Sequence, residues 1–102
     1  MTHTKDSIIQ TLKLNAEQLR TYGVEEIGLF GSYVRDEATI KSDIDLLVDI
    51  RKEKKTFRNF MSLAYYLEDI FDCKVELVTK QSLSPFIGPH ILNTAEYVSI
   101  SG

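Results

Sequence analysis

A Gly-Ser pair and an Asp-x-Asp pair stand ten residues apart in this 102-residue chain, and each borders an apolar run. Gly31 and Ser32 follow one run, and Asp43 and Asp45 open the next. Side chains alternate between faces along a strand, so the two aspartates should share a face about 7 Å apart. If both pairs hold one ligand, the strands are most simply antiparallel neighbours joined by a loop.

The residue types in the two pairs suit a nucleoside triphosphate bound with divalent metal. Asp43 and Asp45 would raise each other's pKa unless a cation neutralised them, and their hard oxygen ligands favour Mg²⁺ or Mn²⁺ over zinc. A strand that runs through a Gly-Ser turn into a helix leaves backbone N–H groups free for phosphate. Gly31 permits the turn, and Ser32 can cap the helix and donate to a phosphate oxygen.

Three residues near these pairs have open or lesser roles. Arg35, one turn after the Gly-Ser pair, either reaches a phosphate or forms a salt bridge with a carboxylate such as Asp36 or Glu37. Ser42 is interpreted as a turn or capping residue, and Asp49 as a solvated strand end. The helical stretch after the Gly-Ser pair is expected to run to about Asp36.

Apolar periodicity and turn residues divide the rest of the chain into alternating helices and strands. We expect helices over Lys5–Tyr22, Thr56–Phe71 and from Ser84-Pro85 to about Asn93, and strands over Val24–Phe30, Asp43–Ile50, Lys74–Thr79 and Tyr97–Ile100. The first helix, ended by Gly23, should bury Ile8, Leu12, Ala16 and Leu19, and the second Phe57, Phe60, Met61, Ala64, Leu67 and Phe71. The predicted fold class is α/β, a small mixed sheet flanked by helices, in one domain over residues 1–102.

The motif resembles the nucleotidyltransferase superfamily that includes DNA polymerase beta and, more narrowly, its minimal nucleotidyltransferase (MNT) family. Three segments carry the resemblance: LFGSYVRDEA at Leu29–Ala38, SDIDLLVDI at Ser42–Ile50 and KVELV at Lys74–Val78. It implies a third carboxylate on a later strand, where Glu76 stands between two apolar residues. Asp43, Asp45 and Glu76 would then be the catalytic and metal-binding residues, with Gly31, Ser32 and Arg35 at the nucleotide.

Two positions depart from the family pattern. The third carboxylate is often Asp, so Glu76 would carry its charge one methylene further out. Asp36 stands where the family often has Gly. Neither departure removes a required group, but either could change metal geometry or rate.

The resemblance also implies a function. MNT proteins are antitoxins that transfer AMP from ATP to a tyrosine of a HEPN RNase toxin and so disable it, here with two Mg²⁺ ions. One alternative is a binding-only antitoxin with a vestigial nucleotide site. Another is a small-molecule nucleotidyltransferase whose pocket is completed by a second subunit. Oligomeric state, alone or with a toxin, stays open.

Composition excludes several other classes of protein. A net charge of −3 and a pI near 5.3 argue against direct nucleic-acid binding, and the cluster Arg51, Lys52, Lys54 and Lys55 is expected to be a solvated loop. No apolar run approaches the roughly 20 residues of a membrane span and no signal-peptide core is present, so a cytoplasmic protein is expected. Cys73 is interpreted as a buried structural thiol, and neither His3 nor His90 as a metal ligand.

Overall fold

The computed structural model describes residues 3–35, 37–39, 42–83, 85–86 and 88–100. Their elements follow in the order α1 (Lys5–Leu14), α2 (Ala16–Thr21), β1 (Val24–Phe30), β2 (Ile44–Ile50), α3 (Phe57–Phe71), β3 (Val75–Thr79), α4 (Gly88–Thr94) and β4 (Glu96–Ser99). Short 3₁₀ turns occupy Gly31–Tyr33, Lys52–Lys54 and Lys80–Ser82. The α/β prediction is confirmed.

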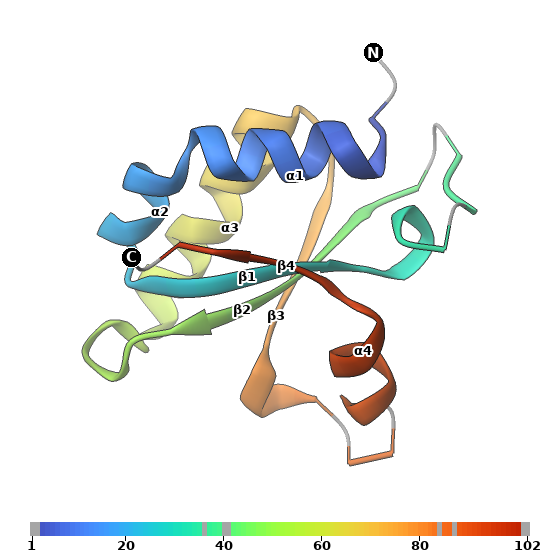
Figure 1. Cartoon of the computed structure of the whole chain (residues 1–102). Helices are drawn as coiled ribbons and strands as arrows, with labels where there is room; N and C mark the ends of the chain where they lie inside the picture. Colours follow the sequence, from blue (N-terminus) through green and yellow to red (C-terminus); the bar gives the residue numbers. More distant parts are fainter. Residues whose placement is uncertain (1–2, 36, 40–41, 84, 87, 101–102) are drawn as a thin grey trace.

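The strands form one mixed sheet in the order β3-β2-β1-β4. β1 is antiparallel to both β2 and β4, whereas β2 and β3 are parallel. Figure 1 shows α1, α2 and α3 on one side of this sheet and α4 on the other. The antiparallel pairing predicted for the two motif strands is confirmed, and it brings the end of β1 beside the start of β2.

The core lies between the sheet and the helices α1, α2 and α3 on one side of it. Of the stripe predicted for the first helix, Ile8, Leu12 and Leu19 are fully buried, and Ala16 packs partly buried against them. Strand residues such as Ile27 and Leu46 belong to the same core cluster, and both are fully buried. Burying such side chains stabilises the fold by roughly 1.5–3 kcal/mol each, which gives the catalytic loop a rigid support.

The first predicted helix is interrupted, because Asn15 separates α1 from α2. The Asn15 amide donates to the Thr11 carbonyl, and its oxygen accepts from the Tyr66 hydroxyl at 2.8 Å. Asparagine side chains that bond the backbone compete with helix continuation. A partner from α3, 51 residues away, therefore fixes the break, and a single continuous helix was the wrong prediction.

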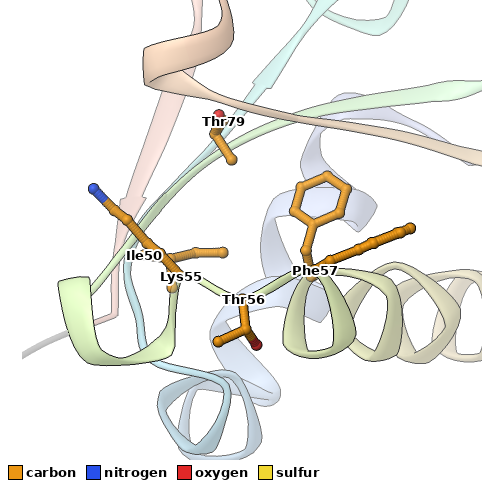
Figure 2. A pocket seen from close by; sticks show the side chains of 6 residues that line it. Ile50, Lys55, Thr56, Phe57 and Thr79 are labelled. Carbon is orange, nitrogen blue, oxygen red and sulfur yellow. The ribbon is translucent and has the colours of Figure 1, made fainter.

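α3 begins after Thr56, whose hydroxyl accepts from the Asn59 N–H at 3.1 Å and caps the helix. Its Leu67 and Phe71 are buried as predicted, but Phe57 is 70% exposed, so its assignment to the core was wrong. Figure 2 shows Phe57 beside a hollow that Thr56 and Thr79 also line. Phe57 lies in the first turn of α3, and its ring is outside the core.

The last helix, the last strand and the basic cluster are close to what the sequence predicted, except that the last helix begins later. The last helix is α4 from Gly88; Pro85 and Phe86 form a turn before it, and Ser84 lies outside the described residues. The predicted tail strand is confirmed as β4. The residues of the basic cluster are all exposed, as predicted. Within the described residues, no helix combines the length and apolarity needed to cross a membrane.

Candidate active site

The Gly-Ser turn packs directly against the Asp-x-Asp motif. Gly31 has a φ of +79°, in the left-handed region that favours glycine. A Cβ at this position would overlap Asp45 Oδ2 and lie 3.0 Å from Asp45 Cγ. Phe30, the preceding residue, pairs with Asp45 across the antiparallel strands. A side chain here is therefore excluded both by the backbone angle and by the carboxylate.

Asp45 also meets Glu76, because the two are register partners on the parallel strands β2 and β3. The pKa of Asp45 is raised from 3.8 to about 6, first by burial and then by the charge of Glu76 and a side-chain hydrogen bond with it. Asp43 adds a smaller effect in the same direction. The structure thus places Asp45 next to Glu76, with Asp43 near enough for its charge to act on Asp45.

Asp43 lies one residue before β2 rather than inside it. The backbone at this point is held by the Ile44 N–H, which donates to the Lys74 carbonyl at 3.1 Å. Cys73 is half-buried, not fully buried as predicted. Burial raises the pKa of its thiol, and the negative charge of Asp43 raises it further, which keeps Cys73 in the neutral form.

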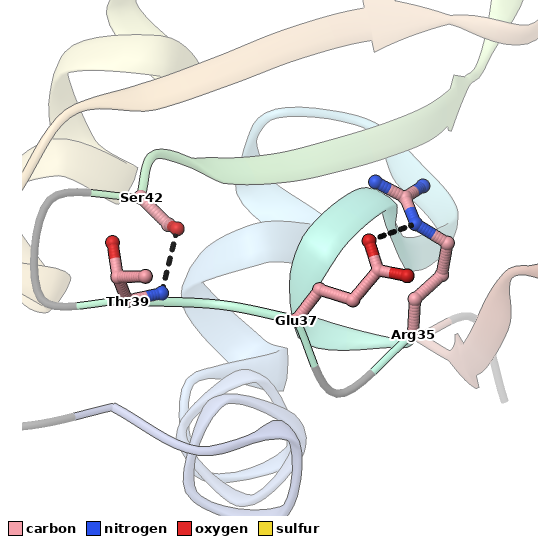
Figure 3. Close-up of polar contacts among 4 residues, drawn as sticks. All are labelled: Arg35, Glu37, Thr39 and Ser42. Carbon is pink, nitrogen blue, oxygen red and sulfur yellow. Dashed lines mark hydrogen bonds and ion pairs between the residues drawn. The ribbon is translucent and has the colours of Figure 1, made fainter.

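Arg35 forms the salt bridge that was one of the two roles left open by the sequence. Its Nε donates to Glu37 Oε2 at 3.2 Å, and both side chains are more than half exposed (Figure 3). Such an exposed ion pair contributes little to stability. The Arg35 charge also acts on Asp45, where it lowers the pKa against the other causes. Arg35 is therefore close enough to the carboxylates to act on a ligand bound there.

Ser32 lies inside a single 3₁₀ turn, Gly31–Tyr33, and no side-chain bond caps that turn. The predicted capping role of Ser32 is therefore wrong, and the predicted helix is shorter than expected, with its proposed end at Asp36 outside the described residues. The Ser32 carbonyl accepts from the Glu37 N–H at 2.9 Å, which closes the turn.

The return loop is closed by Ser42. Its hydroxyl accepts from the Thr39 N–H at 2.8 Å, and its own N–H donates to the Thr39 carbonyl at 3.0 Å (Figure 3). Ser42 is thus the turn residue that the sequence predicted. This closed turn leads directly into Asp43 and so sets where β2 begins.

Lys80 was missed by sequence reasoning. Its Nζ lies 2.6 Å from Glu26 Oε1 and 5.2 Å from the centroid of the Tyr97 ring. Glu26 pairs with Asp49, and Asp49 lies on the same face of the sheet as Asp45. Lys80, Glu26 and Tyr97 therefore lie on that face, at the end of β2 away from Asp45. Asp49 is half-buried there, and its charge raises the pKa of Lys80, so Asp49 is not the solvated strand end that was predicted.

The donor set was tested for its fit to metal. Among the described residues, no group of three or more His, Cys, Asp or Glu side chains is drawn together closely enough to hold an ion. Asp45 and Glu76 nevertheless share a hydrogen bond, and the donors are all carboxylate oxygens. This chemistry fits a hard divalent ion whose remaining ligands come from phosphate and water.

Known proteins resemble this chain in both sequence and fold. The family profile of a nucleotidyltransferase domain matches residues 9–98. Protein adenylyltransferase MntA of Thermococcus cleftensis is 42% identical over 96 residues, which cover 93% of this chain and 96% of that protein. Among solved structures, one provisionally described as a minimal nucleotidyltransferase superposes with a TM-score of 0.70 at 28% identity, over 86% of this chain and 93% of that one.

A second solved structure is a tyrosine-to-alanine variant of the MntA–HpeT toxin–antitoxin complex. It superposes with a TM-score of 0.62 at 26% identity, and the match covers 95% of this chain and 72% of the chain in that structure. The match of sequence and fold across nearly the whole chain confirms the resemblance given by the Gly-Ser and Asp-x-Asp motifs. The chain belongs to the nucleotidyltransferase family, in the minimal group that includes MntA.

Proposed function

We propose that this protein is an Mg²⁺-dependent protein adenylyltransferase that transfers AMP from ATP to a tyrosine of a HEPN-type toxin and so acts as its antitoxin. The observation that carries the proposal is Asp45, packed against Gly31 and hydrogen-bonded to Glu76, in a chain 42% identical to an adenylyltransferase. The similarity to an MntA toxin–antitoxin complex supports the choice of a toxin as acceptor. A cytoplasmic location is part of the same proposal.

Each site residue has a role that follows from its position. Asp43 and Asp45 would hold the metal that accompanies ATP, and Glu76 would hold a second ion. Ser32 and the N–H groups of its turn would orient the β and γ phosphates. Arg35 would add positive charge near them, since its charge already acts on Asp45.

The bound metal supplies charge neutralisation and a more acidic acceptor hydroxyl. In the transfer, a bond forms between the tyrosine oxygen and the α-phosphorus, and the bond from that phosphorus to the bridging oxygen breaks. Pyrophosphate leaves with that electron pair, and the phenol proton passes to solvent at the exposed Glu76. Positioning and charge neutralisation therefore provide most of the rate enhancement.

The carboxylates of the site also hold protons that metal must displace. Because its pKa is raised to about 6 by burial and by Glu76 beside it, Asp45 holds its proton to about pH 6. A cation that takes its place neutralises two neighbouring anions at once. The pair is thus arranged to gain more from a divalent ion than isolated surface carboxylates would.

A transfer assay tests the proposal. The protein is incubated with α-labelled ATP, Mg²⁺ and a purified HEPN-type toxin as partner, in parallel with the Asp43→Asn/Asp45→Asn double variant. Asp49→Asn serves as the matched control, because it removes a carboxylate from the same face of β2 at the far end. We expect label on the partner with the wild type and with Asp49→Asn, and none with the double variant.

Other results identify the alternatives. No transfer, with the partner neutralised equally by the wild type and the double variant, would establish a binding-only antitoxin. Label found only on an added small molecule would establish a small-molecule nucleotidyltransferase. Either result contradicts the proposed function.

A further inference from the structure

β3 is an edge strand, and in the described part of the chain no strand pairs with its outer side. The Lys74 carbonyl accepts from β2, so backbone groups of alternate residues face β2. Those of Val75, Leu77 and Thr79 therefore point outward. An edge of this kind is a template for another extended chain.

The first outward group is already bonded. The Val75 N–H donates to Glu68 Oε2 at 3.2 Å, so a carboxylate from α3 occupies the place where the carbonyl of a neighbouring strand would stand. Leu77 and Thr79 lie further along the same edge, away from Glu68. The edge is thus blocked at its start and open along the rest of β3.

A groove runs beside this open edge, between β3 and α3. One hollow of about 390 Å³ is lined by residues that include Met61, Tyr65, Leu77 and Glu76, and a second of about 340 Å³ reaches Thr79. Phe60 lines both hollows, so they adjoin along α3. Phe57 and Tyr65, 70% and 63% exposed, add uncovered aromatic surface to the wall formed by α3. Figure 2 shows Phe57 at the start of this helix.

One wall of the groove is therefore backbone with hydrogen-bonding groups, and the other is an apolar stripe on α3. This combination suits an extended polypeptide, whose main chain pairs with a strand edge while alternate side chains enter pockets. Glu76, the register partner of Asp45, is among the residues that line the first hollow. A segment held along the edge of β3 would therefore pass beside the carboxylate pair that an acceptor hydroxyl must reach.

We propose that the acceptor tyrosine is presented on an extended segment that adds as a fifth strand to the outer edge of β3. The proposal rests on the proposed adenylyltransferase function and names how the acceptor is recognised. Successive side chains of an added strand point to opposite faces. A tyrosine directed to the face of Asp45 and Glu76 therefore sends the residues before and after it into the groove, where Met61, Tyr65 and Leu77 favour apolar side chains.

Two measurements on the full-length protein test this docking. The first is label transfer to the partner protein by Tyr65→Glu, with Ser62→Glu as the control that adds the same charge to the same helix outside the groove. Both positions are exposed, so neither change disturbs the core. The second is hydrogen exchange of the Leu77 and Thr79 amides in the free protein and after the partner is added. Met61→Glu repeats the transfer test from inside the groove.

We expect Tyr65→Glu and Met61→Glu to raise the KM for the partner about tenfold or more, as truncating an interface anchor does, with the KM for ATP unchanged. Ser62→Glu should match the wild type. The two amides should exchange quickly in the free protein and become protected with the partner.

Three results separate the docking from the function. Normal transfer by both groove variants, or unprotected amides during normal transfer, would refute the docking and leave the adenylyltransferase function intact. Amides that become protected with the partner while no label is transferred would support the docking and refute the adenylyltransferase function. Amides already protected in the free protein, together with a dimer in sedimentation, would show that a second copy occupies the edge and would also refute the docking.

Discussion

Replacing Asp45 by asparagine should stabilise the metal-free protein while it removes activity. The folded pKa of Asp45, about 6, lies above its ordinary value of 3.8. Folding therefore favours the protonated form, and the stability that this provides is full below pH 4 and is lost as the pH rises through 6. Asparagine keeps the shape and has no charge to bury.

The magnitude follows from the two pKa values. Their difference of about 2 corresponds to about 3 kcal/mol at 1.36 kcal/mol for each unit of pKa. Asp45 is only half-buried, so solvent screening reduces this to about 1–2 kcal/mol. For a chain of this size, such a gain raises the Tm by about 5–10 °C.

Urea unfolding in the presence of a chelator measures the effect. At pH 8 the free energy of unfolding of Asp45→Asn should exceed that of the wild type, and at pH 4 the two should agree within error. Asp49→Asn is the control on the same strand and should change stability at pH 8 by less than about 0.5 kcal/mol. Equal or lower stability of Asp45→Asn at pH 8 would refute the reasoning that ionised Asp45 strains the fold.

Three further predictions concern the same loop and carboxylates. Gly31→Ala should lower the free energy of unfolding by at least about 1–2 kcal/mol, because alanine is strained at positive φ and its methyl meets Asp45; urea unfolding measures this. Mg²⁺ affinity, measured by calorimetry, should fall as the pH drops below about 6, where a proton competes at Asp45; equal affinity at pH 5 and pH 8 would contradict this. Arg35→Ala should raise the pKa of Asp45 further, and Arg35→Lys should leave it nearly unchanged; carboxyl NMR titration distinguishes them, and a lower pKa in Arg35→Ala would exclude the stated charge effect.

Local patterns were sufficient to predict the centre of this fold. Two apolar runs joined by a turn with Gly31 at one end and Asp43 at the other allow few arrangements, and antiparallel pairing is confirmed. Glu76 was placed by the family resemblance, with apolar neighbours that fit a strand, and it is the register partner of Asp45. The strand pairing itself depends on residues close in sequence and on strand alternation.

The features that were wrong depend on distant contacts. The Asn15 side chain at the helix break bonds the Tyr66 hydroxyl from α3, and the exposure of Phe57 has no signal in the apolar periodicity of its helix. The link between Lys80 and Glu26 spans 54 residues and has no local pattern. The groove beside β3 follows from strand order, which alternation along one segment does not define.

The central claim is that the Asp45 and Glu76 pair supports transfer of AMP to a protein tyrosine. Its most direct test is mass spectrometry of the partner after incubation with ATP, Mg²⁺ and either the wild type or Asp45→Asn. We predict added AMP that maps to tyrosine with the wild type only. An unmodified partner with the wild type, or equal modification by Asp45→Asn, would contradict the account.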